Sequence, residues 1–256
     1  MFEQFITTID TLGRNRKITV LLPHNYETSE TNYPVIYMHD AQNLFDDSTA
    51  TGGQSWRVQN YFKLPEHTDS IVVAIDNSEF RLGEYSPFIA CDYALELTSH
   101  FTLPMAQGIE YVDWITNGLK PLIDKKYRTL SQSRYTAIVG SSMGGLISLY
   151  AGITYPDVYG NLGILSPAFW FCKDEMAKYV TSHPLPITTS VYMSVGTVEG
   201  GGIAHNEDYL RDAIEFKELL VEQNCSLEFI IISDGIHHES AWEQLTDKWM
   251  KFFQLN

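Results

Sequence analysis

The chain has 256 residues, of which 44% are hydrophobic, enough for the core of one sizeable domain. Lysine and arginine number 17 against 32 aspartates and glutamates, so the formal charge is −15, which repels nucleic acids and anionic membrane surfaces. Three widely spaced cysteines without a CxxC motif indicate neither a disulfide framework nor a zinc site. Because no long apolar run or signal-peptide pattern is present, we expect a soluble cytoplasmic protein without membrane insertion.

The chain begins with two expected strands, 2–9 and 16–22, and then alternates between strands and helices. The later expected strands are apolar on both faces, as in a parallel sheet covered on each side, and lie at 34–40, 70–76, 135–141, 160–166, 190–196 and 227–233. Helical periodicity appears between them, at 107–124, 145–155, 207–223 and 239–254. We therefore predict one α/β domain over residues 1–256, with a mostly parallel, doubly wound sheet and an antiparallel N-terminal strand pair.

A serine lies between glycines at the end of one of these strands. Gly140-Ser141-Ser142-Met143-Gly144 fits G-x-S-x-G after a strand and before a helix, which is the context of a nucleophile elbow. Chance alone gives about one such match in ten chains of this length, but the strand and helix make chance less probable. The tight turn requires nearly side-chain-free neighbours, and the helix N-terminus favours a developing negative charge. Ser142 is the predicted nucleophile.

A serine hydroxyl needs a base, and the base needs an orienting acid. In α/β-hydrolases these follow in the order serine, acid, histidine. The expected last strand is followed by DGIHHESAW, which supplies His237 and His238. Glu199, in the glycine-rich loop after the strand at 190–196, is the predicted acid. The alternatives are Asp208, Glu207 and Asp234.

An oxyanion hole in this fold combines the N–H after the nucleophile, here that of Met143, with an N–H from the loop after an earlier strand. That loop is HDAQNLFDDS, beginning at residue 39. Asp40 and Asn43 are also typical of a turn in which such side chains form hydrogen bonds with nearby backbone groups. A structural turn and an oxyanion loop are compatible interpretations of this segment.

Several segments together resemble one known family: LLPHNYETSETNYPVIYMHDAQNLFD, IVGSSMGGLISLYAGITYPDVYG, LSPAFWF, VGTVEGG and HHESAW. In this order they resemble the esterase D-like, or "putative esterase", family of α/β-hydrolases, which includes siderophore, feruloyl and acetyl-xylan esterases. The resemblance runs from about Val20 to Phe253 and implies the α/β-hydrolase fold.

The resemblance also assigns individual residues. It implies His237 as the catalytic histidine and the N–H of Gln42 as the second oxyanion donor, and it matches Glu199 through Gly-x-x-Glu. Ala41 stands where the family often has glycine. Some siderophore esterases of the group are thought to act with serine and histidine alone, so a backbone carbonyl is the alternative to Glu199.

The predicted substrate-binding residues are Asp40, Trp170 and Tyr85. Trp170 lies in SPAFWF, directly after a strand. Each aromatic in the segments expected to overhang the site is nevertheless, taken singly, more typical of the core: Trp56, Tyr85, Phe88, Tyr93, Phe101, Phe169, Trp170 and Phe171. The long irregular segment 77–108 is a candidate cap or substrate-binding insertion. Within it, Arg81 and Glu84 either meet a polar substrate group or pair with each other.

These observations predict a serine carboxylesterase that forms an acyl-enzyme on a small or medium, short-acyl ester, with no metal or organic cofactor. The alternatives are a siderophore or phenolic-carbohydrate ester hydrolase, an acyltransferase, and a non-catalytic binding module of the same fold. A small-molecule ester is the expected partner. Monomer and homodimer both remain open.

Overall fold

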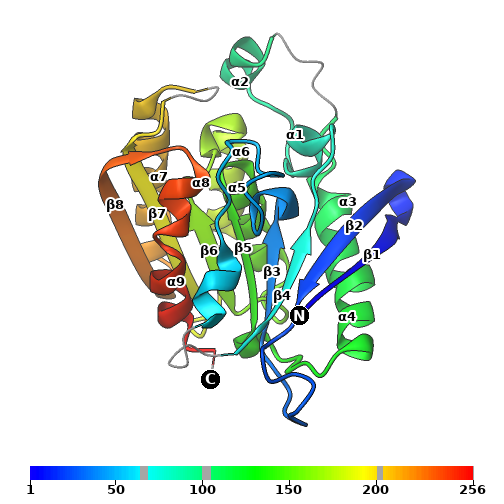
Figure 1. Cartoon of the computed structure of the whole chain (residues 1–256). Coiled ribbons are helices and arrows are strands. Elements are labelled where there is room, and N and C mark those ends of the chain that lie inside the picture. Colours follow the sequence, from blue (N-terminus) through cyan, green and yellow to red (C-terminus); the bar gives the residue numbers. More distant parts are fainter. Residues whose placement is uncertain (64–68, 100–104, 201–203, 256) are drawn as a thin grey trace.

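The computed structural model describes residues 1–63, 69–99, 105–200 and 204–255. An eight-stranded sheet forms the centre of the molecule (Figure 1). In chain order its strands are β1 Phe2–Ile9, β2 Arg14–Leu21, β3 Val35–His39, β4 Ile71–Ile75, β5 Thr136–Ser141, β6 Asn161–Leu165, β7 Ser190–Val198 and β8 Ser226–Ile236. Their spatial order is β1-β2-β4-β3-β5-β6-β7-β8. Only the β1–β2 and β2–β4 pairs are antiparallel, which confirms the predicted fold class.

The central strands are buried because their side chains pack into two hydrophobic cores, one on each face of the sheet. Along β3, Val35 and Tyr37 belong to the core on one face, whereas Ile36 and Met38 belong to the core on the other. Successive side chains of a strand point to opposite faces, so a continuous apolar run is what a sheet covered on both sides requires.

Helices cover both faces (Figure 1). They are α1 Arg81–Glu84, α2 Asp92–Leu97, α3 Gly108–Trp114, α4 Lys120–Lys126, α5 Met143–Thr154, α6 Lys173–Ser182, α7 Asn206–Val221, α8 Glu239–Glu243 and α9 Thr246–Phe253. The helix expected at 107–124 is confirmed, with a π-helical turn at Ile115–Leu119 joining α3 to α4. The single helix expected at 239–254 is wrong, because the chain breaks into α8 and α9.

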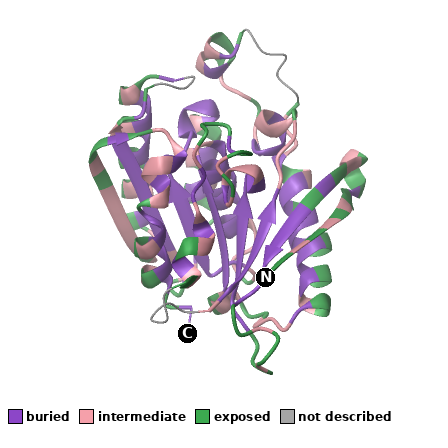
Figure 2. Ribbon diagram, in the orientation of Figure 1, coloured by how far each residue is buried: buried purple, intermediate pink, exposed green. Residues whose placement is uncertain are grey.

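Strand β8 also differs from expectation. Its apolar sequence predicted burial on both faces, but β8 forms the edge of the sheet, and most of its residues are half-buried or exposed (Figure 2). An edge strand has one neighbour in place of two, which sequence alone does not reveal.

The segment 77–108 lies beyond the end of β4 and contains α1 and α2 (Figure 1). Residues 100–104, including Phe101, lie outside the described part of the chain, so its role as a cap stays a prediction. No helix in the described ranges combines the length and apolar character needed to cross a bilayer.

Candidate active site

Ser142 occupies a sharp turn between β5 and α5. Its backbone is in an unusual conformation for a residue with a side chain, with φ 59° and ψ −125°. The turn is tied to the segment after β6: the Ser142 N–H donates to Leu165 O at 2.9 Å, and Ser142 O accepts from Ala168 N at 3.0 Å. Ser142 remains partly exposed.

The two glycines of the motif are not equally constrained. A Cβ placed on Gly140 would lie 2.6 Å from the backbone of Gly144, which is too close for any side chain. A Cβ on Gly144 would lie 3.5 Å from the Asp40 carboxylate and from His39, an ordinary packing distance. The expectation that both positions need glycine therefore holds strictly for Gly140.

His237 is paired with a buried carboxylate. Its Nδ1 lies 2.7 Å from Oε2 of Glu199, whose side chain is fully buried. The other oxygen, Oε1, accepts the Ser166 hydroxyl at 2.6 Å and the Gly196 N–H at 2.5 Å. Both acceptor atoms are thus satisfied, which fixes the carboxylate and, through it, the imidazole ring.

The other sequence candidates have different partners. His238 caps α8, accepting the Ser240 N–H at Nδ1, and its Nε2 lies 3.2 Å from the carbonyl of Gly52. Asp208 forms an ion pair with Arg211, and Glu207 and Asp234 are exposed. Among these candidates, Glu199 is the acid that contacts His237.

The strands carrying this pair approach each other closely. Glu199 follows β7 and His237 follows β8, and a register shift interrupts their pairing after Gly196. A Cβ on Gly196 would collide with the carbonyl oxygen of Gly235. Glycine at this position therefore permits the approach of the two strand ends.

Ser142 and His237 both line a cavity of about 350 Å3 at the carboxyl ends of the strands. The lining residues are Asp40, Asn43, Thr51, Gly52, Asn77, Arg81, Ser141, Ser142, His237, His238, Glu239 and Trp242. Within the described ranges, no group of three or more His, Cys, Asp or Glu side chains is placed to hold a metal ion.

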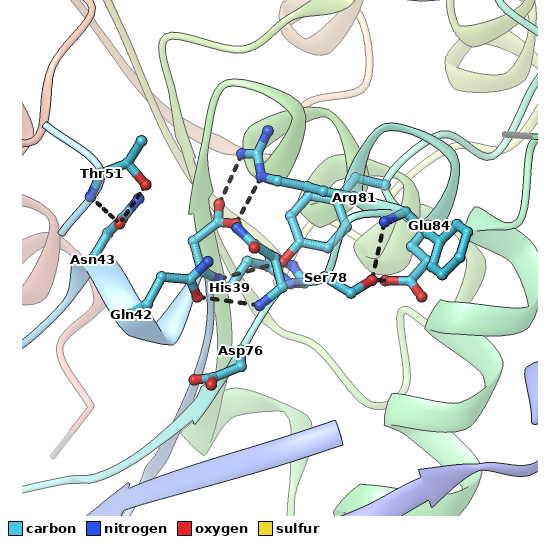
Figure 3. A network of polar contacts seen from close by, with 12 residues as sticks. His39, Gln42, Asn43, Thr51, Asp76, Ser78, Arg81 and Glu84 are labelled. Atoms are coloured by element: carbon cyan, nitrogen blue, oxygen red, sulfur yellow. Dashed lines mark hydrogen bonds and ion pairs between the residues drawn. The ribbon is translucent and has the colours of Figure 1, made fainter. Parts of the chain in front are cut away.

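Asp40 and Arg81 form an ion pair in the wall of this cavity (Figure 3). Nε and Nη2 of Arg81 lie 2.7 and 2.8 Å from the two Asp40 oxygens, and Asn77 also donates to the carboxylate. Burial favours the neutral acid, but Arg81 outweighs it and lowers the pKa of Asp40. Asp40 is therefore held ionised, in a left-handed backbone conformation (φ 60°).

The alternative in which Arg81 pairs with Glu84 is wrong. Glu84 is fully buried and binds two arginines of β2, with Arg16 Nη2 2.8 Å from each carboxylate oxygen and Arg14 Nη1 2.9 Å from Oε1. Figure 3 shows Arg81 and Glu84 in separate clusters of contacts. Sequence proximity suggested a local pair, whereas the fold brings each residue a tertiary partner.

The loop after β3 forms a 3₁₀ turn at Ala41–Asn43. The Gln42 side chain accepts the Asn77 N–H at 3.2 Å, and Asn43 accepts the Thr51 N–H at 3.0 Å (Figure 3). Gln42 and Met143 both lie in the first turn of a helical segment, where N–H groups have no intrahelical acceptor. Neither residue itself lines the cavity, although their neighbours do.

Two predicted substrate-binding side chains are buried and do not line the cavity. Tyr85 is fully buried beneath the ion pair: its hydroxyl accepts the Asp40 N–H at 3.3 Å, and its ring lies 4.9 Å from the Arg81 guanidinium. Trp170 is 3% exposed and packs edge-on against Tyr209. Both therefore support residues of the site from behind.

One protein-family model matches nearly the whole length of the chain. The family described as "putative esterase" matches residues 9–251. The chain belongs to this esterase family. Relatives include the Uncharacterized protein YbbA (31% identical, covering 73% of this chain and 70% of the relative) and the Ferri-bacillibactin esterase BesA (28%, covering 86% and 78%), both of Bacillus subtilis. A solved IroE-like serine hydrolase from Shewanella oneidensis has the same fold, with a TM-score of 0.77 at 19% identity, covering 99% of this chain and 80% of that one.

Three further residues lie against His237 or its partner Glu199 and were not predicted from the sequence: Trp242, Tyr209 and Ser166. Trp242 lies edge-on to the His237 ring, with a distance of 5.1 Å between ring centroids. Its Nε1 donates to Ser166 Oγ at 3.0 Å, and the Ser166 hydroxyl in turn donates to the Glu199 carboxylate. The Tyr209 ring lies 4.6 Å from His237. Burial raises the pKa of Tyr209 to about 12, against the opposing effect of hydrogen-bonding contacts with Trp170 and Ser142. Trp242 and Ser166 had a signal, their places in HHESAW and LSPAFWF, whereas Tyr209 had none.

Proposed function

We propose that this esterase is a serine carboxylic-ester hydrolase in which Ser142 is the nucleophile, His237 the general base and Glu199 the orienting acid. The observation that carries the proposal is the 2.7 Å contact between His237 and a fully buried Glu199, at the cavity that Ser142 also lines. A buried carboxylate fixes the tautomer with hydrogen on Nδ1, which leaves Nε2 free to accept a proton.

In the acylation step the Ser142 oxygen bonds to the ester carbonyl carbon while its proton passes to Nε2 of His237. The N–H groups of Met143 and Gln42 are the proposed donors to the oxyanion. When the C–O bond to the alcohol breaks, His237 returns the proton to the leaving oxygen. A water molecule then repeats the sequence on the acyl-enzyme and releases the acid.

The proposed substrate is a small or medium ester with a short acyl group. The cavity of about 350 Å3 is at the lower end of the usual range for small-molecule sites. Its wall offers an ion pair, Asp40–Arg81, rather than a cluster of basic residues, which favours a neutral, polar ester. Asp40 is the proposed substrate contact, and Tyr85 and Trp170 support the wall from behind.

A second candidate substrate is a siderophore ester, which the relationship to the ferri-bacillibactin esterase BesA favours. Arg81 could meet an anionic group of such a ligand, because within the described part of the chain its Nη1 has no hydrogen-bond acceptor. Comparing kcat/KM for ferri-bacillibactin with that for nitrophenyl acetate separates the candidates. A ratio of more than about 100 in favour of ferri-bacillibactin would select the siderophore ester.

The nucleophile is tested by fluorophosphonate labelling of wild type and Ser142→Ala. We expect wild type to be labelled and the variant to be unreactive, because the probe bonds to the activated serine oxygen. Equal labelling of both proteins would overturn the proposal.

The base is tested by the pair His237→Ala and His238→Ala. The first should lower kcat by at least about 10³-fold, while the second, which removes a helix cap, should retain most turnover. The reverse result would exchange the two histidines. A series of nitrophenyl esters of increasing acyl length then reports the size of the acyl pocket.

A further inference from the structure

The outer edge of the sheet at β8 lacks the features that usually prevent strand pairing. β8 pairs in parallel with β7 on one side, and regular pairing runs from Ser226 to Ile232. No proline, lysine or arginine occurs in this stretch, SLEFIII. Exposed edges in monomeric proteins are commonly protected by such residues or by bulges, because free N–H and C=O groups invite another strand. Within the described ranges no strand pairs with the other side of β8, so residues 226–232 present about 23 Å of edge to the outside.

The side chains of this strand are apolar and incompletely covered. Ile231 is 47% exposed, and its neighbours in the stretch are half-buried: Leu227, Phe229, Ile230 and Ile232. Figure 2 shows β8 as a mostly half-buried and exposed strand beside buried β7. A sheet that ended here in water would leave these side chains without apolar neighbours on their outer side.

Helix α7 continues the apolar surface. Ile214 and Val221 are 39% and 48% exposed and lie seven residues apart, so they share one side of the helix. Lys173 of α6 binds Asp212 and Glu215 on a different side of α7. Ile214 and Val221 therefore lie on a side of α7 that does not face α6, on a helix that packs on β7 and β8. We call β8 residues 226–232 together with Ile214 and Val221 the β8–α7 edge.

The charge of the β8–α7 edge suits contact between two acidic chains. Each chain carries −15, so two copies repel except where acidic residues are few or neutralised. Glu228 is the acid of the stretch, and it shares a surface groove with Lys248 and Lys251. On α7, Lys217 and Glu218, which lie between Ile214 and Val221, pair with each other at 2.7 Å.

We propose that the β8–α7 edge binds the same edge of a second copy about a two-fold axis. The β8 strands pair antiparallel, which joins two eight-stranded sheets into one of sixteen strands, and the α7 helices meet through Ile214 and Val221. When Phe229 lies opposite Phe229 of the second copy, residues 226–232 of the two copies pair along their whole length. Glu228 of each copy then lies opposite Ile230 of the other. No like charges then face each other, so the strand is complementary to itself.

The test is the solution mass of four full-length proteins by analytical ultracentrifugation over a range up to about 100 µM. Wild type should have twice the 29.1 kDa chain mass. Ile231→Lys and Ile214→Lys should each raise the dimer dissociation constant at least about tenfold, because each places a lysine in an apolar contact of both copies, with residue 231 opposite Leu227 of the second copy. Ile109→Lys, at a 54% exposed isoleucine of α3, is the matched control and should remain dimeric.

Three outcomes would overturn the proposal: a monomeric wild type, dimers that survive both edge substitutions, or equal dissociation by Ile109→Lys. A dimer insensitive to both edge variants would use another face of the molecule. Should Ile231→Lys fail to fold, Ile214→Lys decides alone, because its side chain projects from an exposed side of a helix. Hydrogen exchange gives an independent readout: amides of 226–232 should become more protected as wild-type concentration rises.

Discussion

The two oxygens of Glu199 have different partners. Oε1 accepts hydrogen bonds from Ser166 and the Gly196 N–H, and Oε2 faces Nδ1 of His237. In Glu199→Gln the amide oxygen can keep the first two bonds, but the NH2 group then faces Nδ1 and favours the tautomer with hydrogen on Nε2. We expect kcat to fall by about 10³- to 10⁴-fold with little change in KM, measured with a nitrophenyl ester.

Glu207→Gln is the control for this change, since Glu207 was an alternative acid and its side chain is exposed. Its kcat should stay within about twofold of wild type. If Glu199→Gln were equally active, a backbone carbonyl or another group would have to orient His237.

At the same residue scale, sequence could predict what is local and not what is tertiary. Ser142 and Gly140 belong to one turn, so a short stretch of the sequence is enough to predict both. Ser166, directly after β6, contacts Glu199, and Tyr209 of α7 contacts His237, and no spacing in the sequence links either residue to its partner. Their roles follow only from the folded arrangement.

At the scale of elements, Glu84 anchors the short helix α1 to strand β2. Its buried carboxylate accepts hydrogen bonds from Arg14, Arg16 and Ser78. Glu84→Gln would leave the buried Arg16 guanidinium without its counter-charge. We expect the free energy of unfolding to fall by about 3–5 kcal/mol, measured by urea denaturation.

Glu79→Gln provides the comparison, because Glu79 is exposed a few residues earlier in the same segment. Its free energy of unfolding should change by less than about 0.5 kcal/mol. A loss of equal size in both variants would mean that the segment is sensitive to any change of charge, and that the Glu84 cluster has no special role.

The elements themselves were predicted best where periodicity is strong. Every expected strand and the helices at 145–155 and 207–223 formed close to their expected bounds. Helix α6 was missed because its apolar side is narrow, with Met176 and Val180 as its buried residues. Strand β8 has the composition of a central strand, and its edge position depends on the order of strands in space.

At the scale of the whole molecule, the sheet order gathers residues that are far apart in sequence. β3, β5, β7 and β8 end on the same side of a mostly parallel sheet, so the loops that follow them bring Asp40, Ser142, Glu199 and His237 to one region. This much was predictable from strand order along the chain. Glu199 was also the predicted partner of His237, but strand order alone left Asp208, Glu207 and Asp234 as alternatives, and only the folded structure distinguishes the four acids.

The same sheet buries a titratable group at its centre. His39 ends β3, is 2% exposed, and packs between Tyr85 and Tyr111, with Nδ1 3.0 Å from the Tyr111 hydroxyl. Burial, assisted by Arg81 and opposed by Asp40, lowers the pKa of His39 to about 4. In the unfolded chain the pKa is about 6.5, so unfolding takes up a proton at any pH between these values.

Stability should therefore fall as the pH drops from about 6.5 to about 4, by up to about 1.4 kcal/mol per pH unit from His39 alone. The lowered pKa of Asp40 acts below this window. His39→Gln should be less stable at pH 7, yet lose less stability on acidification, as measured by urea unfolding at pH 7, 6, 5 and 4.5. The control is His24→Gln, at an exposed histidine, which should have the same dependence of unfolding free energy on pH as wild type. Parallel slopes for wild type and His39→Gln would show that the buried imidazole takes up its proton without unfolding.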